Sequence, residues 1–134
     1  AAIGAALALK GSGKLAVAIQ SDGDMLMTSS AIWTAAKHRI PLLMVMHNNQ
    51  SYFNSEEHGM EVAKFRKRDV GNAGIGTHVD DPAIDFAMMA KSFGVNSEGP
   101  VRNPADLRPA IERGVKYVKE KQLPYLVDVI AEPR

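Results

Sequence analysis

The chain of 134 residues contains no cysteine. This absence excludes disulfides, thiolate nucleophiles and zinc or iron–sulfur sites bound by cysteine, and it is compatible with a reducing cytoplasm. A large charge of either sign is also missing, because the formal net charge is +1. Such a balance argues against a nucleic-acid-binding surface. We therefore expect a cytoplasmic protein without a nucleic-acid partner.

Long apolar runs are absent as well. The apolar start, residues 1–9, is too short to span a membrane, and no basic segment precedes it as in a signal peptide. We expect no membrane partner. The length fits one domain, residues 1–134, that buries about two-thirds of its unfolded surface. Because the first residue is Ala1 rather than Met, we expect an N-terminally truncated piece of a longer protein.

Helical and strand patterns alternate along the chain. Helices are expected at residues 1–10, 28–39, 57–68, 82–93 and 104–120, and strands at residues 14–20, 41–47, 95–98 and 124–131. Thr28 or Ser29 is the expected cap of the second helix. Strands separated by helices predict an α/β fold, a doubly wound parallel sheet with helices on both faces.

Two short polar motifs stand where predicted strands end. Residues 21–24 read Ser-Asp-Gly-Asp and residues 47–49 read His-Asn-Asn, with one helix and one strand between them. Each motif alone is most often a turn or the start of a loop. Together they follow two strands, and the carboxyl edge of an open parallel sheet is where ligands bind. The pair therefore predicts a ligand site at that edge.

The residue types in these motifs suit a magnesium ion. Mg²⁺ prefers about six hard oxygen ligands, usually shared between protein, phosphate and water. Asp22 offers a carboxylate, Asn49 an amide oxygen, and Ser51 a backbone carbonyl beside them. We predict that these three residues hold the metal.

The same motifs suit a diphosphate. Gly23 lets the chain turn without a Cβ in the way, so the amides of Gly23, Asp24 and Met25 can approach phosphate oxygens at the start of the next helix. The positive end of the helix dipole lies there. Metal and amides would then hold one anion from two sides.

At these residues the sequence resembles the thiamine diphosphate (ThDP) enzymes, whose motif is Gly-Asp-Gly, a spacer of about this length, and Asn-Asn. It is most similar to benzoylformate decarboxylase and the acetolactate synthase-like group, through residues 31–36, 40–41, 48–49, 84–87 and 93–95. The resemblance runs through nearly the whole chain. It implies the diphosphate-binding domain, with Mg²⁺ on the predicted ligands and ThDP lined by Gly23, Asp24 and Tyr52.

Two residues depart from the family pattern. Ser21 stands where the family usually has glycine, and it is tolerated if its side chain points away from phosphate. Asp24 stands where serine or threonine is common, and its carboxylate would be repelled by a diphosphate unless it turns outward or caps the helix.

The resemblance also implies a reaction. ThDP enzymes cleave or form carbon–carbon bonds next to the carbonyl of 2-oxo acids, and the cofactor carries the hard chemistry. Residues just beyond the Asn-Asn pair approach the substrate in the family, which points here to Phe53, Asn54 and Ser55. The nearby acids Glu56 and Glu57 are weaker candidates for acid–base help.

Residues 56–58, Glu-Glu-His, also raise the question of a metal site. The spacing around His58 fits no zinc pattern, so a solvated loop is the favoured interpretation.

Catalysis in this family needs a glutamate that activates the cofactor from a separate pyrimidine-binding domain, and no such domain is found in this sequence. We expect that domain in the same or a partner chain, assembly into a homodimer or homotetramer, and no activity from this chain alone. Two alternatives stay open: a non-catalytic phosphate- or nucleotide-binding module of flavodoxin type, and a natural short subunit of a split ThDP enzyme.

Residues 50–81 form an expected connection much longer than the usual four to six residues or so, which makes them functional or disordered. Gly71, Gly74 and Gly76 supply flexible points. We expect this segment to be mobile until the cofactor orders its first residues.

Overall fold

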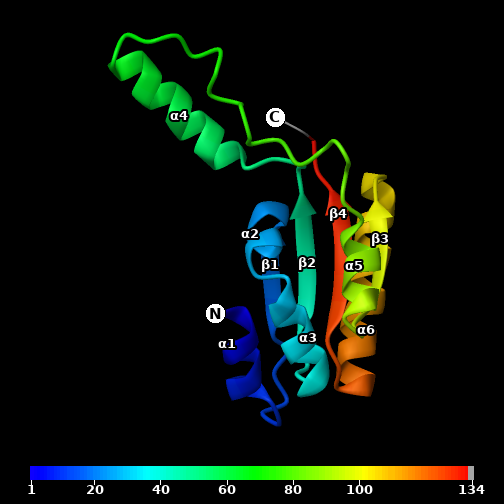
Figure 1. Cartoon of the computed structure of the whole chain (residues 1–134). Helices are drawn as coiled ribbons and strands as arrows, with labels where there is room; N and C mark the ends of the chain where they lie inside the picture. Colours follow the sequence, from blue (N-terminus) through cyan, green and yellow to red (C-terminus); the bar gives the residue numbers. More distant parts are fainter. Residues whose placement is uncertain (133–134) are drawn as a thin grey trace.

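The computed structural model describes residues 1–132, and its centre is one sheet of four strands. The strands run parallel in the order β1-β2-β4-β3. Their bounds are β1 (Val17–Ser21), β2 (Leu43–Asn48), β3 (Asn96–Val101) and β4 (Tyr125–Ile130). Since all strands point the same way, their carboxyl ends meet at one edge, which is the upper edge in Figure 1.

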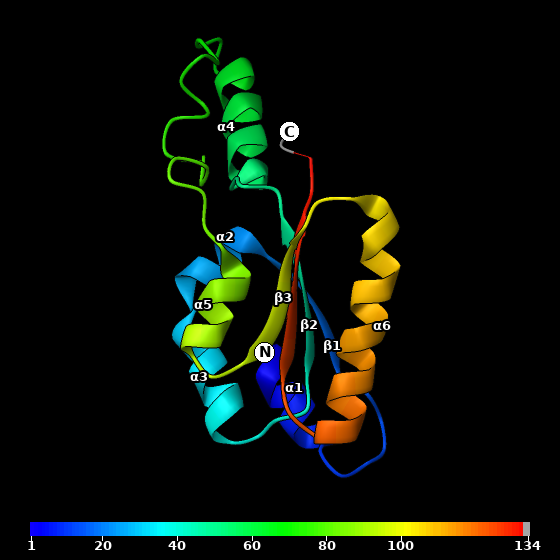
Figure 2. The same cartoon turned by 90° about the vertical axis from the view of Figure 1, so that its right-hand side faces the viewer.

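Helices cover both faces of this sheet, as expected for a doubly wound fold. Figure 2 shows α6 on one face and α2, α3 and α5 on the other. The helices are α1 (Ala2–Leu9), α2 (Asp22–Met27), α3 (Ser30–Lys37), α4 (Phe53–Phe65), α5 (Phe86–Ser92) and α6 (Pro104–Lys121). Within residues 1–132, no helix combines the length and apolarity needed to cross a membrane.

The core has two halves because side chains alternate between the faces of each strand. On β2, Met44 and Met46 pack in the half beneath α2, α3 and α5, whereas Leu43 packs in the half beneath α6. On β4, Leu126 and Val127 divide in the same way. These residues are buried, so the sheet is a rigid support for whatever lies at its carboxyl edge.

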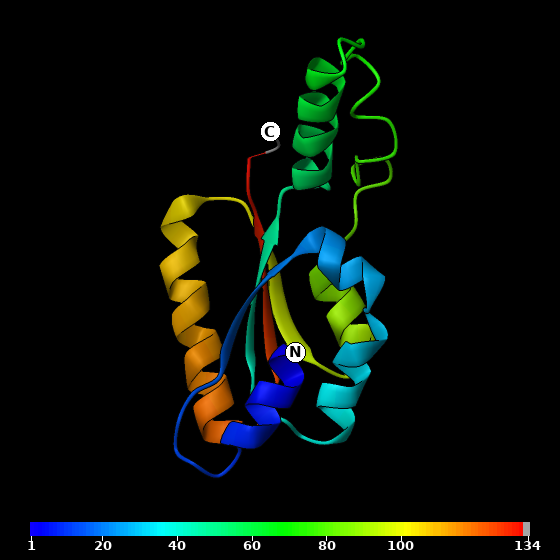
Figure 3. The ribbon, with the colours of Figure 1, turned by 90° about the vertical axis from the view of Figure 1, so that its left-hand side faces the viewer.

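One part of the chain leaves this compact body. Figures 1 and 3 show α4 and the segment after it standing beyond the carboxyl edge of the sheet. We call residues 53–76 the excursion and the rest of the described chain the body. No residue of α4 is buried in the described structure. The expected long connection therefore contains a helix, although that helix packs against little of the body.

Several predicted boundaries are wrong for local reasons. The helix expected at residues 28–39 is α3, which begins two residues later, at Ser30, and a separate short helix, α2, precedes it. Ser29 is the N-cap of α3, but its side chain makes no capping hydrogen bond. The expected helix at residues 57–68 begins earlier, at Phe53, because the amides of Ser55 and Glu56 donate to the carbonyl of Tyr52.

The fourth predicted helix begins later than expected. The sequence predicts it at residues 82–93, but α5 starts at Phe86 because the side chain of Asp85 accepts a hydrogen bond from the amide of Met88 at 2.6 Å. An aspartate in this role fixes the first turn of a helix. The helix ends before Gly94, whose φ of +84° suits glycine.

Candidate functional site

The two polar motifs meet at the carboxyl edge of the sheet because β1 and β2 are neighbours. Ser21, the last residue of β1, is paired with His47 near the end of β2. Asp22 then opens α2, and Asn49 follows β2 directly. The sheet register therefore brings together residues that lie far apart in the sequence.

Asp22 is fully buried at this edge of the sheet. Its Oδ1 accepts a hydrogen bond from the amide of Gly23 at 2.9 Å. Its Oδ2 is also buried and has no hydrogen-bond partner within residues 1–132. A buried carboxylate oxygen without a partner is costly. A cation bound at this oxygen would remove that cost.

The side chain of Asn49 lies between Asp22 and the carbonyl of Ser51. One atom of the Asn49 side-chain amide lies 3.1 Å from Asp22 Oδ1 and 2.9 Å from the carbonyl oxygen of Ser51. If this atom is nitrogen, the amide donates two hydrogen bonds. If it is oxygen, three oxygens converge, and only a cation can hold them together. The donor set therefore fits a hard ion such as Mg²⁺.

The three predicted metal ligands, Asp22, Asn49 and the Ser51 carbonyl, which we call the metal set, are not a cluster of acids or histidines. The described residues contain no group of three or more His, Cys, Asp or Glu side chains that could hold a metal. One carboxylate, one amide and one carbonyl are instead the hard oxygen donors that suit magnesium when phosphate supplies further ligands.

Tyr52 packs against the glycine of the first motif. A Cβ at Gly23 would lie 2.5 Å from the ring of Tyr52, so only glycine leaves room for the ring. The Tyr52 hydroxyl donates to the carbonyl of Gly23 at 3.3 Å. The predicted diphosphate residues Gly23 and Tyr52 are thus direct neighbours.

The two departures from the family pattern have structural roles. Ser21 is the N-cap of α2, and its hydroxyl accepts a hydrogen bond from the amide of Asp24 at 3.4 Å. The side chain of Asp24 is exposed, so the carboxylate can turn toward solvent. Met25 differs from the other predicted residues because its side chain is buried in the core, which leaves its backbone amide for the predicted role.

A single hollow joins most of the predicted residues. It is lined by predicted cofactor residues, by the predicted substrate residues, and by Met27 and His47. Those predicted residues are Ser21, Gly23, Asp24, Asn49, Ser51, Tyr52, Phe53, Asn54 and Ser55. The substrate candidates lie on the first turn of α4 rather than on a loop.

A pair of buried polar residues near the metal set was missed by the sequence analysis. Asn48 Nδ2 donates to Asp128 Oδ1 at 3.1 Å, which joins the carboxyl ends of β2 and β4. Burial raises the pKa of the Asp128 carboxyl, and the hydrogen bond from Asn48 opposes this shift. The available signal was a single carboxylate in an otherwise apolar strand, since Asp128 interrupts β4.

Glu56, Thr77 and His78 were also missed as a group. Thr77 Oγ1 donates to Glu56 Oε2 at 3.1 Å, and His78 Nε2 lies 3.9 Å from the same oxygen. Glu57 and His58 are exposed on α4, in agreement with a solvated segment.

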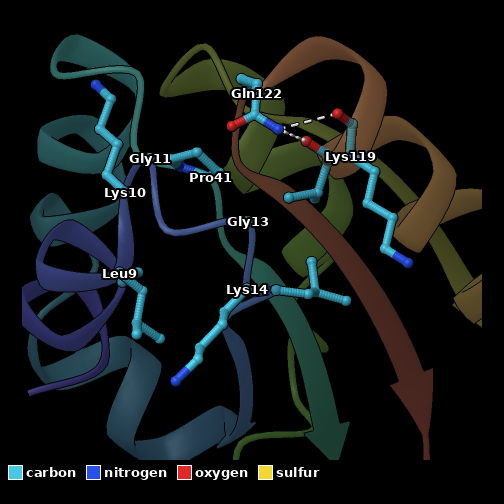
Figure 4. A pocket seen from close by; sticks show the side chains of 11 residues that line it. Leu9, Lys10, Gly11, Gly13, Lys14, Pro41, Lys119 and Gln122 are labelled. Atoms are coloured by element: carbon cyan, nitrogen blue, oxygen red, sulfur yellow. Dashed lines mark hydrogen bonds between the residues drawn. The ribbon is translucent and has the colours of Figure 1, made fainter.

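The opposite end of the sheet has a hollow of a different kind. Lys10, Lys14 and Lys119 line it, but Figure 4 shows their side chains pointing in different directions. Lys10 donates to the carbonyl of His38 at 2.9 Å. These three charges therefore do not converge on one point of this hollow in the described residues.

Comparison with known proteins identifies the family of this chain. Residues 1–129 match the family described as thiamine pyrophosphate enzyme, C-terminal TPP binding domain. A ThDP-dependent 4-hydroxybenzoylformate decarboxylase from Rhodococcus jostii RHA1 has a similar structure, with a TM-score of 0.74 and 23% identity over 99% of this chain and 22% of that chain.

Benzoylformate decarboxylase from Polynucleobacter necessarius is also similar in structure, with a TM-score of 0.71 and 16% identity over 98% of this chain and 22% of that chain. The chain thus spans about a fifth of the length of these structures. Identities this low show a shared fold, whereas the family match covers nearly all of the sequence. This chain belongs to the family of C-terminal TPP-binding domains of thiamine pyrophosphate enzymes.

Proposed function

We propose that this chain holds the diphosphate of ThDP through Mg²⁺ bound by Asp22, Asn49 and the Ser51 carbonyl. The observation that carries the proposal is the convergence of these three groups: the Asn49 amide lies 3.1 Å from Asp22 and 2.9 Å from Ser51, and Asp22 Oδ2 is buried without a partner among residues 1–132. Family membership supports ThDP as the ligand.

The diphosphate would lie in the hollow above this metal set. Gly23 and Asp24, in the first turn of α2, line this hollow. Their amides donate to Asp22 Oδ1 and Ser21 Oγ in this structure and would donate to phosphate oxygens instead, together with the amide of Met25, because the N–H groups at the start of a helix favour anions. Tyr52 closes one side of it by packing on Gly23. Phe53, Asn54 and Ser55 line the same hollow and are therefore the proposed substrate residues.

The complete protein would act on 2-oxo acids by cleaving or forming the carbon–carbon bond next to the carbonyl. ThDP, when bound, supplies the carbanion-stabilising centre for such chemistry. This chain contributes the anchoring residues. The activating glutamate would come from a pyrimidine-binding domain of the same or a partner chain, in a homodimer or homotetramer. The 134-residue chain alone is predicted to show no turnover of pyruvate or benzoylformate.

Calorimetric titration of the complete protein with ThDP and Mg²⁺ tests the proposal. Asp22→Ala is expected to weaken Mg²⁺-dependent ThDP binding by more than about 100-fold. Mutation of a residue that only supports a metal ligand already lowers metal affinity about 10- to 100-fold, and Asp22 is a proposed ligand itself. Asp24→Asn is the matched control on the same helix. It removes an exposed carboxylate beside the site, so binding should stay the same or become tighter. Unchanged binding in Asp22→Ala would remove the metal assignment.

The same titration separates the alternative functions. A non-catalytic flavodoxin-like module would bind a nucleotide as well as ThDP, whereas the proposed site would bind ThDP in a Mg²⁺-dependent manner. A short subunit of a split enzyme would gain activity when a separate pyrimidine-domain chain is added.

A further inference from the structure

We propose that Glu56 and Thr77 form a clasp that positions the Ser51 carbonyl for the metal. This inference rests on the proposed function, because it concerns how one of the proposed ligands is held. It assigns Glu56 and Thr77 as positioning residues, although neither side chain belongs to the metal set.

The clasp begins with a short antiparallel bridge between Ser51 and His78. The residues on either side make its hydrogen bonds: the amide of Tyr52 donates to the carbonyl of Thr77 at 2.7 Å, and the amide of Val79 donates to that of Gln50 at 2.8 Å. In such a bridge the central residues direct their own N–H and C=O groups away from the partner strand. The bridge therefore turns the Ser51 carbonyl toward Asn49.

The side chains of Glu56 and Thr77 close this bridge into a ring. The amide of Tyr52 donates to the carbonyl of Thr77, the hydroxyl of Thr77 donates to Glu56 Oε2 at 3.1 Å, and the amide of Glu56 donates to the carbonyl of Tyr52 at 3.2 Å. Each of the three residues is thus both a donor and an acceptor in the ring. The first turn of α4 and the returning segment cannot separate without breaking it.

The hydroxyl of Thr77 has two acceptors within reach, Glu56 Oε2 at 3.1 Å and a backbone carbonyl at 2.9 Å. The carbonyl of Gly74 lies 2.9 Å from Thr77 Oγ1, but it also accepts from the amide of Thr77 at 3.2 Å. Glu56 Oε2 accepts no other hydrogen bond among the described residues apart from the longer contact with His78. An ionised carboxylate is also the stronger acceptor. We therefore assign the hydroxyl proton to Glu56 in the clasp.

Burial and space around the clasp point to the same role. Thr77 and Ser51 are both buried, unlike their neighbours in the excursion. A Cβ at Gly74 would lie 3.2 Å from Glu56 Oε1 and 3.3 Å from His78 Nε2, so the carboxylate fills the space that this glycine leaves. The clasp is thus a packed joint at the base of an otherwise exposed excursion.

Thr77→Val tests the clasp because it keeps the shape of the side chain and removes the hydroxyl. In the complete protein we expect the Mg²⁺ concentration for half-maximal ThDP binding to rise about ten-fold, within the range for outer partners of metal ligands. ThDP binding at saturating Mg²⁺ should change much less. Thr77→Ser restores the hydroxyl and should restore Mg²⁺ affinity.

Ser97→Ala is the matched control, because Ser97 is also buried and its hydroxyl donates to a backbone carbonyl, that of Ala87, at 2.6 Å. This bond lies in the body, so its loss should lower the melting temperature without changing Mg²⁺ affinity. If Thr77→Val also lowers only the melting temperature, the clasp has no positioning role and the inference is overturned.

Glu56→Ala completes a double-mutant cycle with Thr77→Val. If the two side chains act through one hydrogen bond, the double variant should need no more Mg²⁺ than either single variant. Additive losses would contradict the clasp. Should Thr77→Val fail to fold, Glu56→Gln keeps Thr77 and still weakens the bond by removing the charge, so a rise in the Mg²⁺ requirement remains the expected result.

Asp22→Ala in the same series separates the two proposals. Loss of Mg²⁺-dependent binding in Asp22→Ala together with unchanged Mg²⁺ affinity in Thr77→Val would reject the clasp alone. Unchanged binding in Asp22→Ala would reject the metal site itself.

Discussion

The body and the excursion are held in place by different kinds of interaction. In the body, the central strands β2 and β4 bury residues on both faces of the sheet, and Phe86 on α5 is 1% exposed. In the excursion, no residue of α4 is buried and Phe65 is 88% exposed. The body is held by apolar packing, whereas the base of the excursion is held by a few hydrogen bonds. The proposed metal site lies where the two regions meet, so it combines a rigid carboxylate with a carbonyl that depends on the clasp.

Hydrogen exchange provides the largest expected contrast between the two regions. Amides of β2 and β4 should be protected up to the global stability, whereas amides of residues 53–76 should exchange orders of magnitude faster when no cofactor is bound. Mass spectrometry of the free chain measures both at once. Strong protection throughout residues 50–81 without cofactor would show a preformed segment and contradict the expected mobility.

A pair of phenylalanine substitutions tests the packing difference. Phe86→Ala is expected to lower the free energy of unfolding by about 3–5 kcal/mol, because it leaves a cavity in the core. Phe65→Ala removes an exposed ring and should stay within about 0.5 kcal/mol. Urea unfolding of both variants gives the comparison. Equal losses would mean that Phe65 is packed in solution.

A glycine-to-alanine substitution is expected to lower stability in the body and to raise it in the excursion. A Cβ at Gly114 on α6 would lie 2.7 Å from Leu43 and 3.1 Å from Tyr125, so Gly114→Ala should cost about 1–3 kcal/mol by overpacking. A Cβ at Gly59 on α4 meets nothing closer than 3.8 Å. Gly59→Ala should therefore stabilise α4 by about 0.5–1 kcal/mol. Circular dichroism during urea unfolding checks both values, and a destabilising Gly59→Ala would show hidden packing around α4.

The smallest expected effect is a pH dependence in the body. Because burial raises the pKa of Asp128 in the folded state, its contribution to stability is fully present below the unfolded pKa of about 3.9 and is lost as pH rises through the folded pKa. Asp128→Asn removes this loss. The difference in unfolding free energy between the variant and the original chain should favour the variant more at pH 7 than at pH 4.

Asp69→Asn is the matched control in the excursion, where the carboxylate is exposed and accepts a hydrogen bond from the amide of Gly71 at 2.9 Å. A pH-dependent difference of the same size in this variant would contradict burial as the cause of the Asp128 effect.

The sequence predicts the body far better than the excursion, for a physical reason. Strand and helix patterns are local, and parallel strands must end at the same edge, so Asp22 and Asn49 could be brought together before the structure was known. The cap expected at Thr28 or Ser29 lies at the division between α2 and α3, where Thr28 has φ and ψ of −139° and 36°. Helix α2 was not predicted as a separate element, because six residues are too short to show a helical period.

The clasp lay outside the reach of such patterns. Glu56 and Thr77 are 21 positions apart, and neither stands in a motif. Their contact depends on the length and path of the excursion, after which His78 pairs with Ser51. Similarly, Asn48 and Asp128 lie 80 positions apart and meet only because β2 and β4 are neighbours in the sheet.

The most direct test of the central claim is a crystal structure of the complete protein with ThDP and Mn²⁺, in which anomalous scattering locates the ion. We expect the ion to be bonded to Asp22, to the amide oxygen of Asn49 and to the Ser51 carbonyl, at distances near the 2.0–2.1 Å or so typical of Mg²⁺. An ion bound elsewhere, with the Asn49 nitrogen donating to Asp22 and Ser51, would contradict the account.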